Sequence, residues 1–229
     1  MTIDLVITDA ATLDILVMRS LRAALPAARR ERSDRYERTV DRHASVLVFA
    51  QLQRLWRERC DGVLPPIVTG RFGKPDFGDE AGLHFNFSHD GSLCACVLSP
   101  VPVGVDIAGR VPFEDELFRY MAAPGELRLG ERLRRWDDMS ALWTRKEATV
   151  KRSGLGLSAP LRELDTTGSQ DLVTLGCASA GFNVSLSAAG LSEPELGERL
   201  RVRFLTPQAS DRWSEGPGPP LRRLSPSLT

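Results

Sequence analysis

Two carboxylates and a lysine are the side chains in this 229-residue sequence best suited by type to do chemistry. Asp106 follows Gly104 at the end of an apolar run, and Glu147 lies four residues before Lys151. A hard cation such as Mg²⁺ takes one or two protein carboxylates, and phosphate oxygens and waters complete its coordination shell. A lysine nearby can contact a phosphate as a point charge. These three residues are therefore candidates for binding a metal ion and a phosphate.

Each of these candidates also has a purely structural interpretation. A lone aspartate at a strand end is commonly a turn or capping residue. Trp143, Glu147 and Lys151 are spaced i, i+4, i+8 and share one helix face, where an exposed Glu–Lys pair contributes roughly 0.2–0.5 kcal/mol. Trp143 on the same face argues against full exposure, and a half-buried Glu147 could bind a metal or act as a base. The spacing alone leaves both interpretations open.

A third motif runs from Asn86 to Gly91 and contains Ser88, His89 and Asp90. Adjacent strand residues point to opposite faces, which excludes a Ser–His nucleophile pair. Contact with a phosphate or an adenine is the functional interpretation, and a structural hairpin is the alternative.

Basic residues supply the remaining candidates. Lys74 lies in the stiff loop Gly73-Lys-Pro75, with Arg71 just before it, and can present a charge to a phosphate. Of the 30 basic residues, only three are lysines, and all three fall in the motifs discussed here: Lys74, Lys146 and Lys151. Earlier in the chain, six arginines lie between residues 29 and 42: Arg29, Arg30, Arg32, Arg35, Arg38 and Arg42. This run is either a solvated helix face or a site for an anionic cofactor or an acidic partner.

The overall composition narrows the function classes. The formal net charge is zero, so wholesale nucleic-acid binding is not implied. The hydrophobic content of 42% is ordinary for a globular protein. The sequence has no long apolar run and no basic amino-terminal region, which predicts no membrane span and a cytoplasmic location. Four cysteines, Cys60, Cys94, Cys96 and Cys177, form no CxxC pair, and reduced thiols are expected.

The elements that position these residues follow from apolar periodicity and turn signals. In the first half, helices are expected over residues 12–24 and 41–59, and strands over residues 3–7, 84–88, 93–98 and 102–107. Asp90-Gly91 is a hairpin signal between two of the strands. In the second half, helices are expected over residues 114–121, 124–135 and 139–152, and strands over residues 172–177, 182–186 and 200–205. This order, helices and then antiparallel strands, occurs twice and predicts an α+β fold with two similar halves.

Taken in this order, the motifs resemble the Sfp-type 4′-phosphopantetheinyl transferases. The resemblance extends from about residue 25 to about residue 165. The matching segments are Gly73-Lys-Pro75, Phe87-Ser-His89, Gly104-Val-Asp106, Trp143-Thr-Arg-Lys-Glu147-Ala, Lys151 and Gly154-Leu-Gly156-Leu. Any one motif is weak, whereas the ordered set is specific.

The resemblance implies a monomer of two halves related by a pseudo-twofold axis, with the active site in the cleft between them. Residues 1–105 would form the half that contacts the phosphates and adenine of coenzyme A, and residues 106–205 the half with the metal and the catalytic helix. The chain from residue 206 to 229, rich in proline, glycine and serine, is expected to be a flexible tail.

The resemblance also implies roles for individual residues. Asp106 and Glu147 would hold Mg²⁺ on the pyrophosphate of coenzyme A, and with Lys151 they would form the catalytic set. The residues implied to bind coenzyme A are Arg29, Arg32, Arg42, Arg71, Lys74, Pro75, Ser88, His89 and Lys151. Glu126 looks like an acidic residue that the family often carries between its aspartate and WxxKEA motifs.

The implied activity is Mg²⁺-dependent transfer of the 4′-phosphopantetheine arm to a serine of an apo acyl or peptidyl carrier protein, with release of 3′,5′-ADP. Two departures from the family pattern bear on it. Many members carry a second acid two residues after the strand aspartate, where this chain has Ala108, and the segment after about residue 170 does not align. The alternatives are a degenerate member that binds coenzyme A or a carrier protein without transfer, and an interaction or nucleic-acid domain that uses the arginines.

Overall fold

The computed structural model describes residues 2–78, 81–156 and 159–225 and contains both helices and sheets, which confirms the expected α+β class. Its larger sheet has the order β10-β9-β1-β5-β4, and the second sheet has the order β11-β7-β8-β6. The strands of the larger sheet are β10 (Trp213–Gly216), β9 (Leu200–Pro207), β1 (Ile3–Asp9), β5 (Leu93–Ser99) and β4 (His84–Asp90). Those of the second sheet are β11 (Arg222–Leu224), β7 (Leu172–Cys177), β8 (Phe182–Ala188) and β6 (Val103–Gly109).

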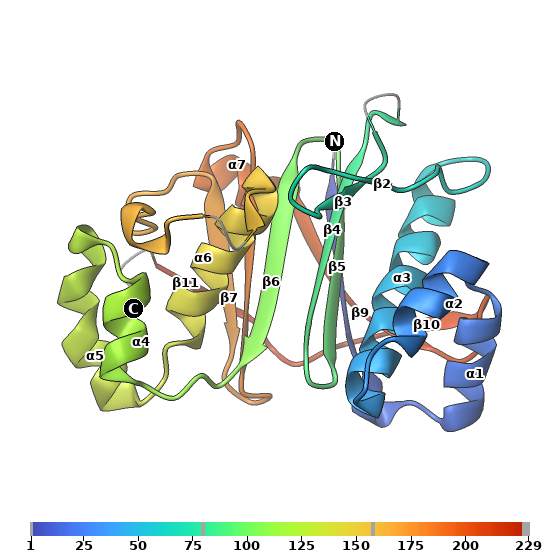
Figure 1. Cartoon of the computed structure of the whole chain (residues 1–229), viewed down its shortest axis with the longest axis horizontal. Coiled ribbons are helices and arrows are strands. Elements are labelled where there is room, and N and C mark those ends of the chain that lie inside the picture. Colours follow the sequence, from blue (N-terminus) through green and yellow to red (C-terminus); the bar gives the residue numbers. More distant parts are fainter. Residues whose placement is uncertain (1, 79–80, 157–158, 226–229) are drawn as a thin grey trace.

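The two sheets pack face to face, with helices on both outer sides (Figure 1). Between the sheets lies a hydrophobic core to which β1 contributes Leu5 and Ile7, β6 contributes Val105, and β8 contributes Val184. Alternate residues of a strand point to opposite faces, so Val6 faces the helices instead. Because both faces of β1 are covered, six of its seven residues are buried, and these include the polar residues Asp4 and Thr8.

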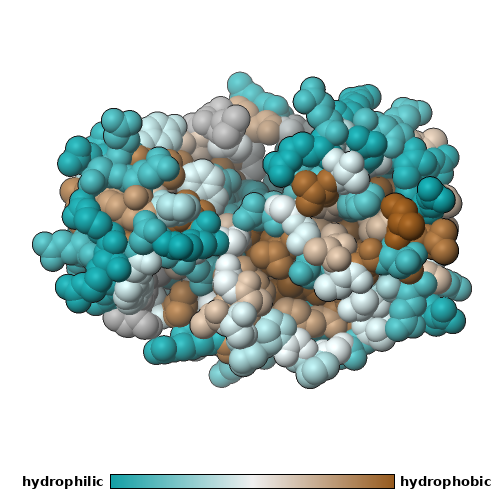
Figure 2. Space-filling view, turned by 90° about the horizontal axis from the view of Figure 1, so that it is seen from below, coloured by the Kyte–Doolittle hydropathy of each residue, from teal (hydrophilic) through white to brown (hydrophobic). Residues whose placement is uncertain are grey.

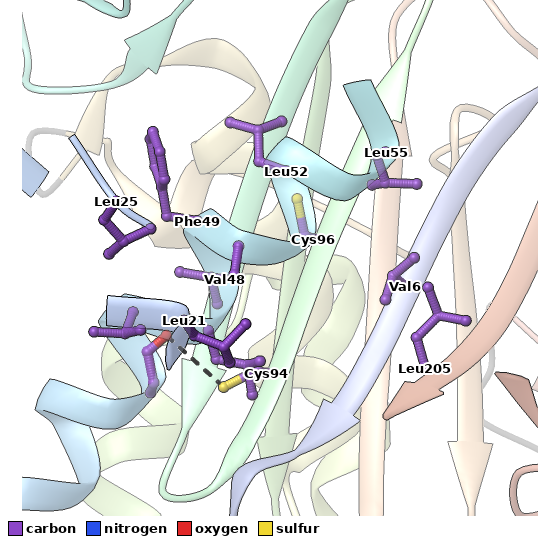
Figure 3. Packing of buried hydrophobic residues seen from close by; sticks show 14 of the residues in the cluster. Val6, Leu21, Leu25, Val48, Phe49, Leu52, Leu55, Cys94, Cys96 and Leu205 are labelled. Atoms are coloured by element: carbon purple, nitrogen blue, oxygen red, sulfur yellow. Dashed lines mark hydrogen bonds between the residues drawn. The ribbon is translucent and has the colours of Figure 1, made fainter. Parts of the chain in front are cut away.

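Three helices cover the larger sheet: α1 (Ile15–Ala23), α2 (Ala27–Asp34) and the long α3 (Thr39–Arg59). In Figure 3, Leu52 and Leu55 of α3 belong to the same buried cluster as Cys96 and Leu205 of the sheet. Cys94 and Cys96 are buried, unpaired thiols whose pKa values are raised by burial. They therefore act as small hydrophobic residues of this core.

The outer side of the second sheet is covered by α6 (Ser140–Ser153). A third hydrophobic cluster joins α6 to the two short helices α4 (Asp115–Met121) and α5 (Gly130–Trp136). The remaining elements are α7 (Glu193–Arg199), the two-stranded ribbon β2 (Val68–Thr69) and β3 (Pro75–Asp76), and the 3₁₀ helices η1 (Ala10–Thr12), η3 (Pro124–Leu129) and η5 (Leu161–Glu163). Each large sheet thus carries one long helix, α3 or α6, on its outer face.

The carboxyl-terminal part of the chain differs from the expectation of two sequential halves and a tail. The boundary expected between residues 105 and 106 falls inside β6. The strand expected at residues 200–205 is present as β9, but it joins the first sheet by pairing in parallel with β1. Within the expected tail of residues 206–229, β10 pairs with β9 and β11 pairs with β7. β10 thus pairs with the strand that precedes it in sequence, whereas β11 pairs with a distant strand.

Within the described ranges, no helix is long and apolar enough to cross a membrane. On the face seen in Figure 2, hydrophilic residues cover the side of α4 and α5, and hydrophobic residues gather toward the middle and the opposite side. Ile15 and Leu16 of α1 are among the large hydrophobic residues exposed to solvent.

Close contact between α6 and β6 depends on Gly104. A Cβ atom at this position would lie 2.1 Å from the carbonyl oxygen of Ala148 and 2.3 Å from the backbone nitrogen of Arg152. We expect Gly104→Ala to lower the free energy of unfolding by at least about 1–3 kcal/mol, because helix and strand must separate. Chemical denaturation measures this, with Gly168→Ala as the control, since a Cβ there meets no atom within 4 Å. Equal stability of the two variants would contradict the close approach.

Candidate functional site

The site lies where the edge strands of the two sheets, β4 and β6, meet beside α6. Side chains join these strands. The Asn86 Oδ1 atom accepts a hydrogen bond from the Val105 amide at 3.0 Å, and the Asp90 Oδ2 atom accepts one from the Gly109 amide at 2.8 Å. Between these two bonds, the Ser88 hydroxyl donates to Asp106 Oδ1 at 2.7 Å. We call this junction of β4 and β6 the seam.

Asp106 is the central residue of the seam and is 5% exposed. Its Oδ1 atom accepts from Ser88 and from the Lys151 ammonium group, whose Nζ lies 2.5 Å away. Its Oδ2 atom is buried and has no hydrogen-bond partner among the described residues. Burial raises the pKa of Asp106, and the charge of Lys151 opposes that shift. A buried carboxylate oxygen without a partner costs free energy, so it is suited to binding a cation.

Helix α6 brings Glu147 and Lys151 to the same place. The helix ends where Gly154 adopts a left-handed conformation with φ of 73°. Glu147 is half-buried, and its pKa is raised first by burial and then by the negative charge of Asp106. Lys151 Nζ also lies 2.9 Å from the Ser88 hydroxyl. Glu147 and Lys151 therefore do not form the exposed ion pair considered above, because the ammonium group of Lys151 bonds to Asp106 instead.

This arrangement fits a divalent cation with two protein carboxylates. Asp106 Oδ2 and the Glu147 carboxylate are hard oxygen donors, and the two charges are close enough to affect one another. Ala108 shares the face of Asp106 on β6, but its methyl side chain has no oxygen that could bind a metal. Asn183 lies across from Ala108 on β8, and its side-chain amide donates a hydrogen bond to the Ser140 hydroxyl. Within residues 2–78, 81–156 and 159–225, no group of three or more His, Cys, Asp or Glu side chains is placed to hold a metal ion.

Lys74 lies at a different place from the Asp106 cluster. Its ammonium group donates to the backbone carbonyls of Val103 and Arg152, at 3.2 and 3.0 Å. Burial lowers the pKa of Lys74. Arg71, whose guanidinium lies over the Phe72 ring, lines a cavity of about 340 Å³ together with Lys74. In this structure the loop before β3, which begins at Pro75, is thus attached to the end of α6.

The expected arginines lie beside α3. Arg29 and Arg32 line a cavity of about 650 Å³ between α2, α3 and the segment after α3. The Arg29 guanidinium lies 4.6 Å from the Phe49 ring centre, and burial, followed by repulsion from Arg32, lowers its pKa to about 10. Arg42 donates to backbone carbonyls of the preceding turn. His89 lies on the opposite face of β4 from Ser88, with its ring centre 6.3 Å from that of Tyr36. Burial lowers the pKa of His89.

The expected site residues therefore form three groups. Ser88, Asp106, Glu147 and Lys151 converge at the seam. Arg29, Arg32 and His89 lie on the side of α2 and α3, and Arg71 and Lys74 lie near the end of α6. No local pattern in the sequence identified Asn86 and Asp90 as the residues that join β4 to β6, because their partners are backbone amides of another strand.

Glu126 lies in a buried ion pair that holds segments of the fold together. Its carboxylate is fully buried and lies 2.6 Å from the Lys146 ammonium group. It also accepts hydrogen bonds from the Ala123 amide and from the amide and hydroxyl of Thr166. Lys146 donates in turn to the carbonyls of residues 161 and 164. This ion pair ties the segments on either side of α6 to the helix that carries Glu147.

Comparison with known proteins agrees with the motifs. Residues 102–185 match the model of the 4′-phosphopantetheinyl transferase superfamily. A 4′-phosphopantetheinyl transferase of Bacillus subtilis is 30% identical over 145 residues, which are 61% of this chain and 64% of that protein. The 4′-phosphopantetheinyl transferase Sfp of Bacillus subtilis strain 168 is 29% identical over 150 residues (62% and 66%). The 4′-phosphopantetheinyl transferase AcpT of Salmonella typhimurium is 36% identical over 120 residues (50% and 62%).

These matches confirm the resemblance to the Sfp-type phosphopantetheinyl transferases. The chain spans slightly less than two thirds of the length of the curated relatives named here. Asp106, Glu147 and Lys151 lie inside the range that the family model matches, whereas the arginines and Lys74 lie outside it.

Because the Glu126–Lys146 pair is buried, removing one partner leaves the other charge uncompensated. We expect Lys146→Met to lower the free energy of unfolding by about 3–5 kcal/mol. The control is Arg134→Met, which breaks the exposed pair with Asp115 and should cost at most about 1 kcal/mol. Urea denaturation of both variants measures the difference. A loss for Lys146→Met no larger than that for the control would contradict a structural role for the pair.

Proposed function

We propose that this chain is a holo-[carrier protein] synthase, a Mg²⁺-dependent 4′-phosphopantetheinyl transferase. It transfers the phosphopantetheine arm of coenzyme A to a serine of an apo acyl or peptidyl carrier protein and releases 3′,5′-ADP. The observation that supports this most is the buried Asp106, which holds an unpartnered carboxylate oxygen beside Glu147 and Lys151. The names of the relatives support the same activity.

Asp106 Oδ2 and Glu147 are the residues that would hold Mg²⁺, with waters in the position that Ala108 leaves without a donor. When bound, Mg²⁺ offsets negative charge on the pyrophosphate oxygens of coenzyme A. Ser88 and Lys151 would fix the other oxygen of Asp106, so that its free oxygen keeps one direction.

The proposed reaction is an in-line displacement at the β-phosphate. Glu147 accepts the proton of the carrier serine hydroxyl, directly or through a water. The serine oxygen forms a bond to the β-phosphorus, and the bond from that phosphorus to the bridging oxygen breaks. Lys151 donates to the leaving phosphate and offsets its charge.

The nucleotide end of coenzyme A would lie along the basic side chains beside the seam. Arg29 and Arg32 line a cavity large enough for a nucleoside. Arg42 lies on α3, and the ring of His89 contacts that of Tyr36, which follows α2. A guanidinium fork is suited to binding a phosphate. Arg71, Lys74 and Pro75 would contribute from the loop, and Lys74 would have to exchange its carbonyl partners for a phosphate.

Further parts of the proposal follow from the resemblance. The two units, each a sheet with one long outer helix, would be related by a pseudo-twofold axis, with coenzyme A between them. Residues 1–105 and 106–205 would form the main parts of the two halves. A monomer that acts in the cytoplasm is the expected state.

Glu147→Gln keeps the shape of the side chain and removes its charge. We expect transfer to fall by at least about 100-fold, because the base and one metal ligand are lost together. Intact-mass spectrometry of an apo carrier protein, incubated with coenzyme A and Mg²⁺, measures the gain of one phosphopantetheine arm. EDTA should abolish the gain for the unsubstituted protein. The matched control is Glu131→Gln, an exposed position on α5, which should transfer normally.

Near-normal transfer by Glu147→Gln would refute the assigned role. If the unsubstituted protein binds coenzyme A but modifies no carrier in a panel of acyl and peptidyl carriers, the chain is instead a binding protein of this family. Ala108 is the feature that would favour this second candidate.

Lys151→Ala removes a cation that contacts Asp106 in the free protein and the leaving phosphate in the reaction. We expect kcat to fall by about 100-fold, while the affinity for coenzyme A changes much less. Steady-state transfer rates and calorimetric titration with coenzyme A separate the two effects. An unchanged kcat with weakened binding would show that Lys151 binds substrate only.

A further inference from the structure

Two residues of β4, Asn86 and Asp90, belong to the motif around Ser88 but have no part in the proposed reaction. They alternate with Ser88 along the strand, so the three side chains leave β4 on the same side. Asn86 is 5% exposed and accepts from Val105, while Asp90 is exposed and accepts from Gly109. Both acceptors are side-chain oxygens, and both donors are backbone amides of β6.

These two bonds join β4 to β6 in place of the backbone hydrogen bonds that join neighbouring strands within a sheet. β6 pairs with β8 on one side, and in an antiparallel pair the amides alternate between the two sides of a strand. The amides of Val105 and Gly109 therefore point toward β4, which belongs to the other sheet. The Asn86–Val105 bond is buried, where an amide without an acceptor is costly, and the Asp90–Gly109 bond lies at the exposed end of the strands. Together the two side chains determine how closely and in which register β4 lies beside β6.

The two bonds flank one residue of the site on each strand. Ser88 lies midway between Asn86 and Asp90, and Asp106 lies between Val105 and Gly109. The contact from Ser88 to Asp106, at 2.7 Å, and the contact from Lys151 to both residues depend on this alignment. We propose that Asn86 and Asp90 are positioning residues, which align Ser88 and Asp106 with Lys151 by accepting hydrogen bonds from β6. The expected effect on transfer rests on the proposed function.

Variants at residue 90 separate hydrogen bonding from charge. Asp90→Asn keeps an oxygen that can accept from Gly109 and removes the charge, whereas Asp90→Ala removes both. Because Asp90 is exposed, neither substitution should prevent folding. Asn86→Leu removes the buried acceptor at nearly constant volume. The control for lost stability is Thr8→Val. It removes two buried hydrogen bonds, one donated to the carbonyl of Leu205 on β9 and one accepted from the side-chain amide of Gln51 on α3.

The sequence itself provides a readout that does not depend on activity. It has only three lysines, so selective ¹³C labelling of lysine gives three sets of side-chain signals in an NMR spectrum. Lys151→Arg identifies the Lys151 signals by their loss. We expect Asn86→Leu and Asp90→Ala to shift the Lys151 signals, because its partners Ser88 and Asp106 move apart. Asp90→Asn and Thr8→Val should leave them in place, and Lys146, buried beside Glu126, is the internal reference.

Transfer kinetics provide the second readout. We expect Asn86→Leu and Asp90→Ala to lower kcat by about tenfold to 100-fold, with little change in KM for coenzyme A, since a small displacement of reacting groups is enough. Asp90→Asn should retain most of the rate. Thr8→Val should lower the melting temperature without lowering kcat.

Three results would overturn the proposal. Lys151 signals that stay in place in both Asn86→Leu and Asp90→Ala would show that the seam does not align this residue. Equal effects of Asp90→Asn and Asp90→Ala would assign the effect to charge instead of hydrogen bonding. A shift in Thr8→Val as large as in Asn86→Leu would indicate a general loss of stability. If the unsubstituted protein shows no transfer, the proposed function fails, while the NMR comparison still decides whether Asn86 and Asp90 align the site.

Discussion

The burial of one carboxylate constrains most of this structure. Asp106 lies at the junction of β4, β6 and α6, and a charge removed from water must be paired and hydrogen-bonded if the fold is to be stable. Its partners come from two other elements, Ser88 on β4 and Lys151 on α6. The two sheets and the helix must therefore keep their positions to within a hydrogen-bond length. The pairing satisfies only one oxygen of Asp106, and the other has no hydrogen-bond partner among the described residues.

The rest of the molecule holds these three elements together. The core between the sheets fixes β6 against β1 and β5, and Gly104 lets α6 approach β6 at backbone contact distance. The buried Glu126–Lys146 pair connects α6 to the segments that precede and follow it. Reactive groups on strands and a packed helix are held more firmly than groups on loops, which suits a reaction that depends on alignment.

Charge is distributed unevenly although the formal net charge is zero. Asp106 is buried at the seam and Glu147 is half-buried, whereas Arg29 and Arg32 lie beside α3, where Arg29 stacks on aromatic rings. The family model covers the seam strand β6 and helix α6 but not the arginines between residues 29 and 42. The part of the chain that resembles the family most clearly is thus the part that holds Asp106, Glu147 and Lys151.

The sequence by itself determined the local elements and indicated which residues could form the site. Helical spacing placed Glu147 and Lys151 on one face, alternation indicated the strands at residues 84–88 and 172–177, and the ordered motifs indicated the family. Only the tertiary structure decided that Lys151 pairs with Asp106, that Lys74 bonds to the end of α6, and that β9 returns to pair with β1. Periodicity records which face of an element is apolar, but not which distant element covers it. The partner of a polar side chain or of an edge strand depends on packing between segments far apart in the chain, and such contacts leave no local pattern.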